Sequence, residues 1–459
     1  MPAEPELRPS ERTPAPRKRP DPPRFGEAEL AAIFSDLAPH RHILLAVSGG
    51  PDSTALMALA RDWQSAGAPG AVEPPALSVA TVDHGLRAGS AEEAAAVAAL
   101  AARLGLSHAT LRWDETKPST GLQAAARTAR YRLLAAHART VGATAIATAH
   151  TCDDQAETLL MRLARGSGID GLAAMSVVSS REGILLVRPL LTIPKARLVA
   201  ELAVRNLPAI ADPSNERTEF ERVRIRREQD ALERLGLSAR ALGESARRIG
   251  RARHALERIA GEALRAIAEA DSLGIVRIDR AALGAHPGEI RLRMLASILA
   301  HAGGTATLPE LRALEALEAL IASGASFRRT LGGCMVLARS RALLVHREPG
   351  RMAVVPTRLE RGASMEFDAR FRLSLSPDAP AALTIGPTTT PWSPALAASA
   401  VLPKGTPALA LRTLPAVLDG GRAIAMAAPG STARPGVGEA LGLTVVAIAP
   451  PWLETATDA

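Results

Sequence analysis

The stretch SGGPDS at residues 48–53 joins an apolar run, His42–Val47, to a helical run, Thr54–Gln64. Its two adjacent glycines let backbone N–H groups approach an anion with no side chain between them, and they permit left-handed backbone angles. The start of the following helix adds the positive end of a helix dipole. The hydroxyls of Ser48 and Ser53 can donate to phosphate oxygens. We therefore predict a phosphate-binding loop rather than a glycine-rich turn that only caps a helix.

Short apolar runs alternate with helical runs from Phe25 to about Leu191. This alternation predicts right-handed βαβ units and a Rossmann-like parallel sheet with helices on both faces. Such sheets bind ligands at the carboxyl ends of their strands, which is where the polar clusters of this sequence occur. The further predicted strands are Ala76–Val82, His108–Trp113 and Ala143–Thr148, and the further helices are Ala91–Leu104, Gly121–Thr140 and Asp154–Arg165.

The composition limits the class of protein. A chain of 459 residues with 47% hydrophobic and 22% charged residues is long enough for two to four globular domains. Its two cysteines, Cys152 and Cys334, are too few for a disulfide framework or a zinc cluster and suit a reducing, cytoplasmic location. No apolar stretch approaches the ~18 residues that a membrane span needs.

The charge is consistent with a polyanionic partner, although a G- and C-rich genome also yields arginine-rich proteins. The formal net charge is +8, and only four of the 55 basic residues are lysine. Arginine is the better bidentate phosphate ligand. Aromatic residues make up 2% of the chain, so electrostatics and shape rather than stacked bases would have to carry nucleic-acid binding.

The remaining chain divides by composition and periodicity. Leu235, Leu242, Ile249 and Leu256 recur every seven residues, which predicts a long connecting helix with an apolar seam. Thr330–Ala338 and Ala342–His346 are expected to form a β-hairpin within a small α-rich domain. The expected organisation is a disordered leader at 1–24, a catalytic domain at 25–228, a connector helix at 229–261, a small α-rich substrate-binding domain at 262–350 and a small, mostly β C-terminal domain at 361–459.

A second polar cluster, TAHTCDDQAET at residues 148–158, ends a predicted strand and opens a helix. Asp153 and Glu157 are four residues apart, and Asp154 and Glu157 three, so these carboxylates share a helix face. Facing a phosphate loop, they can hold Mg²⁺ or a cationic amine. The alternative is that the acidic residues only complement the helix dipole.

These motifs resemble known families. The loop matches the Ser-Gly-Gly-x-Asp-Ser signature of the PP-loop ATP pyrophosphatases, and no Gly-Lys-Ser/Thr follows as in a Walker A loop. Without a lysine for the γ-phosphate, cleavage between the α- and β-phosphates is expected. The ordered set of motifs is similar to the tRNA(Ile)-lysidine synthase family from about Arg41 to Glu348. The supporting motifs are Asp83–Arg87, Ala126–Tyr131, Asp153–Thr158, Arg165–Gly168, Arg188–Leu191, Asp212–Asn215 and Thr330–Cys334.

The resemblance implies a two-step reaction. ATP with Mg²⁺ adenylates the C2 oxygen of the wobble cytidine in a CAU anticodon of tRNA(Ile), and free L-lysine then displaces AMP to leave lysidine. The residues expected to bind ATP are Ser48, Gly49, Gly50, Pro51, Asp52 and Ser53, with Asp52 also holding Mg²⁺. The expected catalytic residues are Asp52, Asp153, Asp154 and Glu157.

Further residues are candidates for RNA and nucleotide contacts. His84, His150, Arg127 and Arg130 are predicted to contact nucleotide or cytidine, with a local structural role as the alternative. Arg222, Arg224, Arg226 and Arg227 are predicted to contact the tRNA backbone, with a solvated helix face as the alternative.

Other functions remain open at this stage. A tRNA thiolase of the same superfamily would need catalytic cysteines, and neither Cys152 nor Cys334 lies in a C-x-x-C pair. Cys152 could still act as a single sulfur carrier. A non-catalytic RNA-binding protein that kept the fold is the rival from another class.

Overall fold

The computed structural model describes residues 24–86, 89–210, 221–305, 307–352, 354–387, 406–420, 422–426 and 441–453. The predicted leader, apart from its last residue, and the Asp212–Asn215 motif lie outside these residues. The chain divides into two compact units, Met1–Arg251 and Ala252–Ala459. The predicted domain boundaries stay a prediction.

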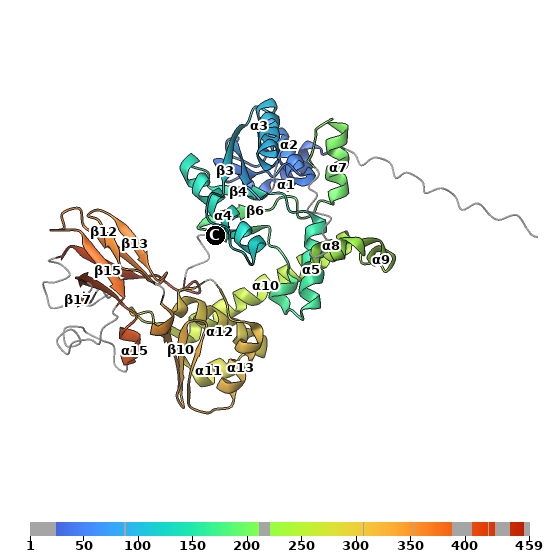
Figure 1. Cartoon of the computed structure of the whole chain (residues 1–459). Coiled ribbons are helices and arrows are strands. Elements are labelled where there is room, and N and C mark those ends of the chain that lie inside the picture. The colour runs from blue at the N-terminus through green and yellow to red at the C-terminus, as the bar shows by residue number, and fades with distance from the viewer. Residues whose placement is uncertain are drawn as a thin grey trace, which may run out of the picture. The chain divides into compact units, whose positions relative to one another are not determined.

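The first unit contains a six-stranded sheet in the order β3-β2-β1-β4-β6-β5 (Figure 1). All neighbouring strands in it pair in parallel except β5, which forms an antiparallel hairpin with β6. The predicted Rossmann-like parallel sheet is therefore confirmed. The strands are β1 (His42–Ala46), β2 (Ala76–Asp83), β3 (Ser107–Arg112), β4 (Ala145–Thr148), β5 (Val178–Arg181) and β6 (Ile184–Val187).

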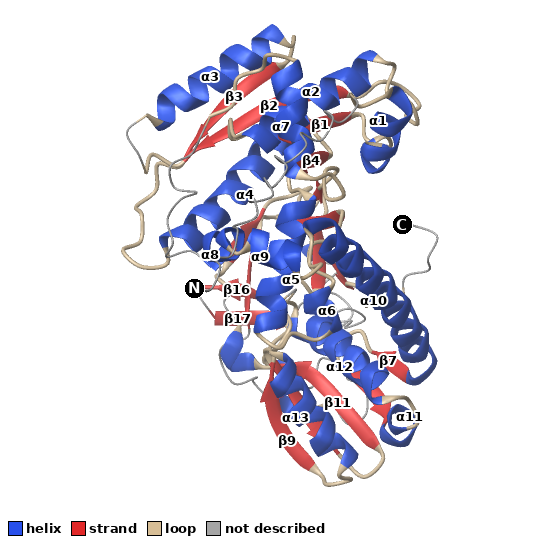
Figure 2. Ribbon diagram, turned by 90° about the vertical axis from the view of Figure 1, so that its right-hand side faces the viewer, coloured by secondary structure: helices blue, strands red, loops and turns tan. Residues whose placement is uncertain are grey.

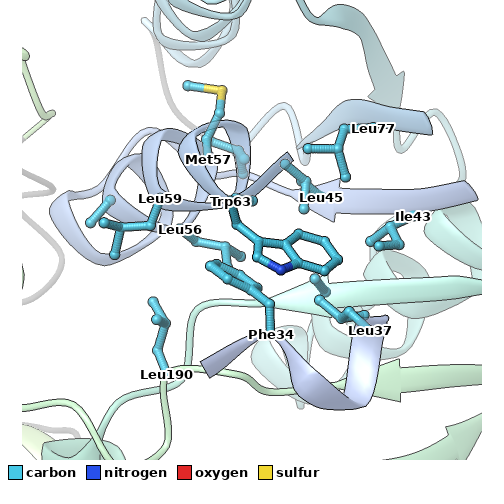
Figure 3. Close-up of a cluster of buried hydrophobic side chains, with 14 of the residues drawn as sticks. Phe34, Leu37, Ile43, Leu45, Leu56, Met57, Leu59, Trp63, Leu77 and Leu190 are labelled. Carbon is cyan, nitrogen blue, oxygen red and sulfur yellow. The ribbon is translucent and has the colours of Figure 1, made fainter. Parts of the chain in front are cut away.

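Helices cover both faces of this sheet because alternate side chains of β1 point to opposite sides. Ile43 and Leu45 belong to one core cluster with Trp63, whereas Leu44 packs in another cluster with Tyr131. Figure 3 shows the first cluster, in which the rings of Phe34 and Trp63 stack with centroids 5.3 Å apart. The first face is covered by α1 (Glu27–Ile33), α2 (Pro51–Ser65), α3 (Ser90–Arg103) and α7 (Lys195–Val204), and the second by α4 (Leu122–Val141).

The strand order reverses at β1. The chain runs from β1 to β2 and β3 on one side, and then returns to place β4 on the other side of β1. A crevice forms at such a reversal, outside the carboxyl ends of the strands. The segments that follow β1, β2 and β4 contain the predicted loop, His84 and His150, so the topology brings all three to one edge of the sheet.

The predicted connecting helix exists but begins later than expected. Helix α10 spans Ala239–Ile267, after α8 (Glu221–Arg227) and α9 (Gln229–Arg234). Leu235 lies before α10 and is exposed, so it is not part of the predicted seam. Leu242 packs against Ala156 and Leu159 of α5 (Cys152–Ala164). Close packing also explains Gly243, because a Cβ there would lie 3.0 Å from the Cys152 Sγ.

The second unit contains a five-stranded antiparallel sheet in the order β7-β8-β11-β10-β9. The sequence predicted only one hairpin here. Helices α12 and α13 pack against this sheet through Leu295, Leu299 and Leu317 (Figure 2). The elements are β7 (Ala268–Ala270), β8 (Val276–Asp279), β9 (Phe327–Leu331), β10 (Cys334–Ala338), β11 (Ala342–Arg347), α11 (Arg280–Gly284), α12 (Gly288–Gly303) and α13 (Leu311–Ala322).

The last part of the chain is mostly β, as predicted. A four-stranded sheet, β12-β15-β16-β17, and a three-stranded sheet, β13-β14-β18, share a core around Phe367 and Phe371. Within the described ranges, no helix has the length and apolar character needed to cross a membrane. The strands are β12 (Thr357–Leu359), β13 (Ser364–Phe367), β14 (Phe371–Leu375), β15 (Leu383–Pro387), β16 (Pro415–Asp419), β17 (Arg422–Met426) and β18 (Leu443–Ala447).

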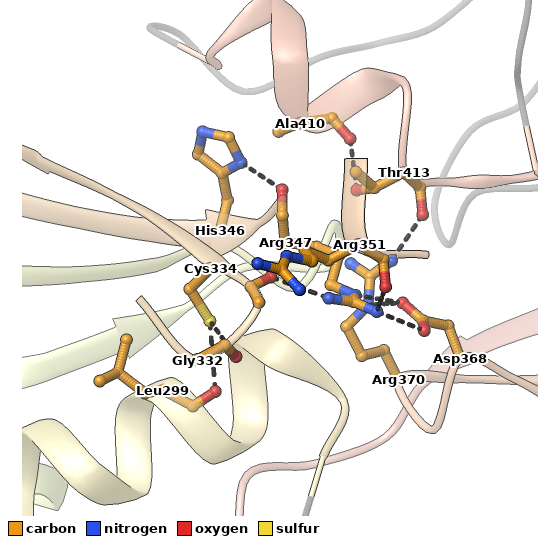
Figure 4. Close-up of polar contacts among 11 residues, drawn as sticks. Leu299, Gly332, Cys334, His346, Arg347, Arg351, Asp368, Arg370, Ala410 and Thr413 are labelled. Atoms are coloured by element: carbon orange, nitrogen blue, oxygen red, sulfur yellow. Dashed lines mark hydrogen bonds and ion pairs between the residues drawn. The ribbon is translucent and has the colours of Figure 1, made fainter. Parts of the chain in front are cut away.

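A buried ion network connects β11 to the turn before β14 (Figure 4). Arg347 Nε donates to Asp368 Oδ2 over 2.8 Å, and Arg370 Nε donates to the same oxygen over 3.0 Å. Arg370 also donates to the Thr413 carbonyl oxygen at 2.5 Å. One carboxylate therefore holds two buried guanidinium groups, and burial lowers the pKa of Arg370 to about 10.

Candidate functional site

The loop after β1 has the backbone that a phosphate site requires. Gly49 has φ +88°, and a Cβ at this position would lie 2.5 Å from Ile210 Cδ1, so only glycine fits. Gly50 is the N-cap of α2 and supplies no side-chain cap, and Pro51 takes the first helical position. The first N–H groups of a helix have no helical acceptor. Those of Asp52 and Ser53 are thus available to an anion at the carboxyl edge.

The side chains of Ser48 and Ser53 are close to each other, and that of Ser53 forms hydrogen bonds within the loop. The Ser53 hydroxyl donates to the Gly50 carbonyl oxygen (3.0 Å) and accepts from the Ser48 N–H (3.2 Å). Ser48 Oγ lies 3.3 Å from Ser53 Oγ. The proton of the Ser53 hydroxyl is therefore used inside the loop, and its backbone N–H remains the group that can meet phosphate.

Asp52 has one paired and one unpaired carboxylate oxygen. Oδ2 lies 3.2 Å from Lys195 Nζ, at the start of α7, whereas Oδ1 is buried with no hydrogen-bond partner in the described part of the chain. Burial raises the pKa of Asp52, and the Lys195 ammonium opposes that shift. An orphaned carboxylate oxygen beside phosphate-binding N–H groups fits a Mg²⁺ ligand.

No group of three or more metal-ligating side chains occurs among the residues that the structure describes. The unpaired Oδ1 of Asp52 fits Mg²⁺ that takes one carboxylate from the protein and its other ligands from phosphates and water. Sequence reasoning missed Lys195. Its only sequence signal is that it is one of four lysines in the chain.

The predicted acidic cluster opens α5 at the end of β4, and two of its members hold backbone groups. Thr151 is the N-cap, and Asp154 Oδ2 accepts from the Thr151 N–H (2.9 Å) in a capping box. Asp153 Oδ2 accepts from the Lys195 backbone N–H over 2.7 Å. These contacts fix the carboxylates beside Asp52, whose pKa their charges raise.

Glu157, the third member, is paired with an arginine that the sequence assigned elsewhere. Arg226 of α8 donates from Nε to Glu157 Oε1 (2.5 Å) and lies 3.7 Å from Asp154. Glu157 is 5% exposed. Burial raises the pKa of the Glu157 carboxyl, and the hydrogen bonds from Arg226 oppose this shift. One predicted tRNA contact thus lies inside the predicted lysine-binding cluster.

A pocket opens beside these groups, between α5, α8, α9 and α10. Leu160, Ile225 and Leu232 contribute apolar walls, and Asp153, Glu157 and Arg226 contribute charge. The other predicted tRNA contacts lie on α8, where Arg222 is half-buried and Arg224 and Arg227 are exposed. The pocket therefore combines an apolar wall with charged groups.

His84 follows β2 and is a neutral acceptor for Arg130 of α4. Arg130 NH2 lies 3.3 Å from His84 Nε2. Burial, followed by the Arg130 charge, lowers the pKa of His84 to about 4. A neutral ring that accepts at Nε2 carries its proton on Nδ1, which is buried without a partner in the described ranges. His84 can thus donate one hydrogen bond to a ligand at this edge.

His150 follows β4. Burial lowers the pKa of His150 to about 4, with smaller contributions from the charges of Arg188, Arg127 and Arg222. Its Nδ1 lies 3.0 Å from Thr148 Oγ1. The structure therefore brings Arg127 and Arg222, which the sequence placed in separate groups, into one electrostatic environment.

Neither cysteine has the properties of a nucleophile. Burial raises the pKa of Cys152 to about 11 and that of Cys334 to about 12. The Cys152 thiol donates to the Ala239 carbonyl oxygen over 3.3 Å. Since the thiolate is the reactive form, both residues are inert at neutral pH.

Comparison with known proteins identifies the domain that contains the loop after β1. The PP-loop domain family matches residues 25–230. The tRNA(Ile)-lysidine synthase of Rhodopseudomonas palustris is 47% identical over 73% of this chain and 96% of its own length. The tRNA(Ile)-lysidine synthase of Bradyrhizobium diazoefficiens is 44% identical over 72% of this chain and 94% of its own length.

The chain belongs to the tRNA(Ile)-lysidine synthase family. The resemblance that the motifs predicted is confirmed, and the protein is an ATP-dependent ligase with a PP-loop domain. Among solved structures, the U34-tRNA thiolase of Methanococcus maripaludis is similar over 48% of this chain and 77% of its own, with 15% identity and a TM-score of 0.40. That likeness is too low to carry an argument about function.

Proposed function

We propose that this lysidine synthase family member adenylates the C2 oxygen of the wobble cytidine in the CAU anticodon of tRNA(Ile), and then joins free L-lysine to C2. In the first step the C2 oxygen attacks the α-phosphorus of ATP and pyrophosphate leaves. In the second, the lysine ε-amine attacks C2, loses a proton, and AMP departs with the oxygen. The amide-like oxygen is a poor leaving group, so adenylation is what makes the exchange feasible. We propose a cytoplasmic location for the enzyme, because tRNA and free lysine are both present there.

The observation that carries this proposal is the loop after β1, with Gly49 in a left-handed conformation and free N–H groups at Asp52 and Ser53. These groups would hold the phosphates of ATP. Asp52, through its unpaired Oδ1, would hold Mg²⁺, which supplies charge neutralisation of the departing pyrophosphate when bound. Lys195 opposes the rise that burial causes in the pKa of Asp52, and it would add one positive charge near the phosphates.

The pocket between α5 and α8 supports the lysine half of the proposal. The leucine and isoleucine side chains of the pocket suit the aliphatic chain of lysine, and the carboxylates of Asp153 and Glu157 suit an ammonium group of lysine. The amine must be neutral to attack, so it needs a base. Glu157 is the best candidate, because it lines the pocket and burial raises the pKa of its carboxyl, which makes it a better proton acceptor.

The experiment offers the full-length enzyme Mg-ATP, labelled lysine and an unmodified tRNA(Ile) with a CAU anticodon. A tRNA(Met) with the same anticodon is the matched control. We expect label on tRNA(Ile) alone. Label on neither RNA would refute the proposed substrate, and equal label on both would refute the proposed selectivity.

A further inference from the structure

Three arginines of the first unit gather around Tyr131, and nothing in the proposed reaction uses them together. The guanidinium carbon of Arg127 lies 5.1 Å from the centre of the Tyr131 ring, and that of Arg181 lies 4.6 Å from it. The charges of both groups lower the pKa of Arg188, after the larger effect of its burial. We call Arg127, Arg181 and Arg188 the arginine cluster.

The cluster is held in place by its surroundings. Arg188 is 8% exposed, and its NH1 donates to the Ser176 carbonyl oxygen (2.8 Å) and to Ser179 Oγ (3.0 Å). Arg181 ends β5 just before a turn in which Glu182 and Gly183 both have positive φ, and Arg139 donates to the Glu182 carbonyl oxygen. Cation–π contact with Tyr131 orders the two exposed guanidinium groups.

Among the residues that the structure describes, no carboxylate neutralises the positive charge of the cluster. In the described ranges, none of its three arginines has a carboxylate within ion-pair distance, and the Arg188 Nε is buried with no hydrogen-bond partner. Like charges gathered in this way cost free energy unless an anion binds among them. A buried unpaired donor beside two exposed guanidinium groups is what a bidentate oxyanion site requires.

Two members of the cluster, Arg127 and Arg188, lie near the proposed reaction centre. The charges of Arg188 and Arg127 act on His150, which follows β4 at the carboxyl edge of the sheet. The phosphates of ATP already have the N–H groups after β1, so the cluster is left for another anion. Tyr131 is 4% exposed and cannot stack on a base. A backbone phosphate of the RNA fits, since Arg127 and Arg181 are accessible to a macromolecule.

We propose that Arg127, Arg181 and Arg188 bind a phosphodiester of the RNA substrate close to the nucleotide that is modified. This inference rests on the proposed function, because it assumes that the substrate is RNA. It gives Arg181 and Arg188, for which the sequence suggested no role, the task of positioning the RNA backbone beside β5 and β6.

The test measures the affinity of the full-length enzyme for a tRNA(Ile) transcript between about 50 and 200 mM salt, with Arg181→Ala, Arg181→Lys and wild type. Arg103→Ala, an exposed arginine on α3, is the control for loss of surface charge. We expect Arg181→Ala to weaken RNA binding about tenfold at the low salt and to reduce the salt slope by roughly one ion. Arg181→Lys should retain most of the slope, and the affinity for Mg-ATP should not change in any variant.

Two results would overturn the inference. One is unchanged RNA affinity and slope in Arg181→Ala. The other is loss of ATP or pyrophosphate binding with normal RNA binding, which would assign the cluster to nucleotide phosphates. Failure of all variants to bind RNA would overturn both the inference and the proposed function. If RNA binding depends on Arg181 but no lysine is incorporated, only the proposed function fails.

Discussion

Arg226 and Glu157 are 69 residues apart in sequence, and their side chains form an ion pair with Nε and Oε1 separated by 2.5 Å. The pair joins α8 to α5 at the edge of the pocket proposed for lysine. Two roles follow for Arg226. It opposes the rise that burial causes in the pKa of Glu157, and it fixes α8 beside the acidic cluster.

Replacing Arg226 by alanine should destabilise the first unit through an unpaired buried carboxylate. We expect a loss of about 2 kcal/mol, less than for a fully buried pair because Arg226 is 34% exposed. Denaturation followed by tryptophan fluorescence measures it, and the exposed Arg227→Ala on the same helix is the control. Equal stability of both variants would contradict a structural role for the pair.

The same variant should show a distinct pH dependence. The folded-state pKa of Glu157 is already raised by burial, and loss of Arg226 raises it further. A raised carboxyl pKa means that the folded state binds the proton more readily than the unfolded chain, so stability is gained as pH falls. The difference in the free energy of unfolding between wild type and Arg226→Ala should therefore shrink from pH 7.5 toward pH 5. A deficit that grows on acidification would exclude Glu157 as its source.

Gly49→Ala should weaken ATP binding at least tenfold. The residue has φ +88°, and an added Cβ would collide with Ile210. Gly67→Ala is the matched control, because Gly67 has φ +84° and nothing within 4 Å of the added atom. Calorimetric titration with Mg-ATP should show at least tenfold weaker binding for the first variant and wild-type binding for the second. Comparable affinity in both would show that the loop geometry does not hold the nucleotide.

Glu157→Gln, Asp153→Ala and Asp154→Ala should each abolish lysine incorporation. If Glu157 is the base, its amide variant should still release pyrophosphate when tRNA is added, because only the second step needs the neutral amine. Single-turnover assays with labelled lysine and labelled ATP separate the two steps. Wild-type lysine incorporation in all three variants would remove the acidic cluster from the mechanism.

Asp368→Ala should strongly destabilise the second unit. It leaves Arg347 and Arg370 buried without their carboxylate, at an expected cost of about 3–5 kcal/mol. The control is Glu366→Ala, two residues before Asp368. It removes the exposed partner of Arg372 and should lower the free energy of unfolding by about 0–1 kcal/mol. Thermal unfolding of the two variants checks the difference. Similar melting temperatures would mean that the network contributes little.

The sequence predicted those features that depend on local pattern. The loop between His42–Val47 and Thr54–Gln64, the parallel sheet and its carboxyl-edge clusters follow from periodicity and glycine placement. The ion pairs of Arg226 and Lys195 could not be predicted, because each joins segments that only the folded chain brings together.

Other errors have local causes. The seven-residue spacing placed Leu235 in the apolar seam of the predicted connecting helix. A turn that contains Gly236, at φ +80°, separates Leu235 from α10 in the structure. Strands β7 and β8 have only three and four residues, too short to show an alternating pattern. The assignments of individual residues to ATP, lysine and tRNA remain predictions.

The central claim is that ATP bound at the loop after β1 is split between its α- and β-phosphates. The most direct measurement follows labelled ATP in a reaction of the full-length enzyme with lysine and tRNA(Ile). The account predicts one AMP and one pyrophosphate for each lysine joined to the RNA, and neither product without tRNA. Release of ADP and inorganic phosphate in step with lysine incorporation would contradict it.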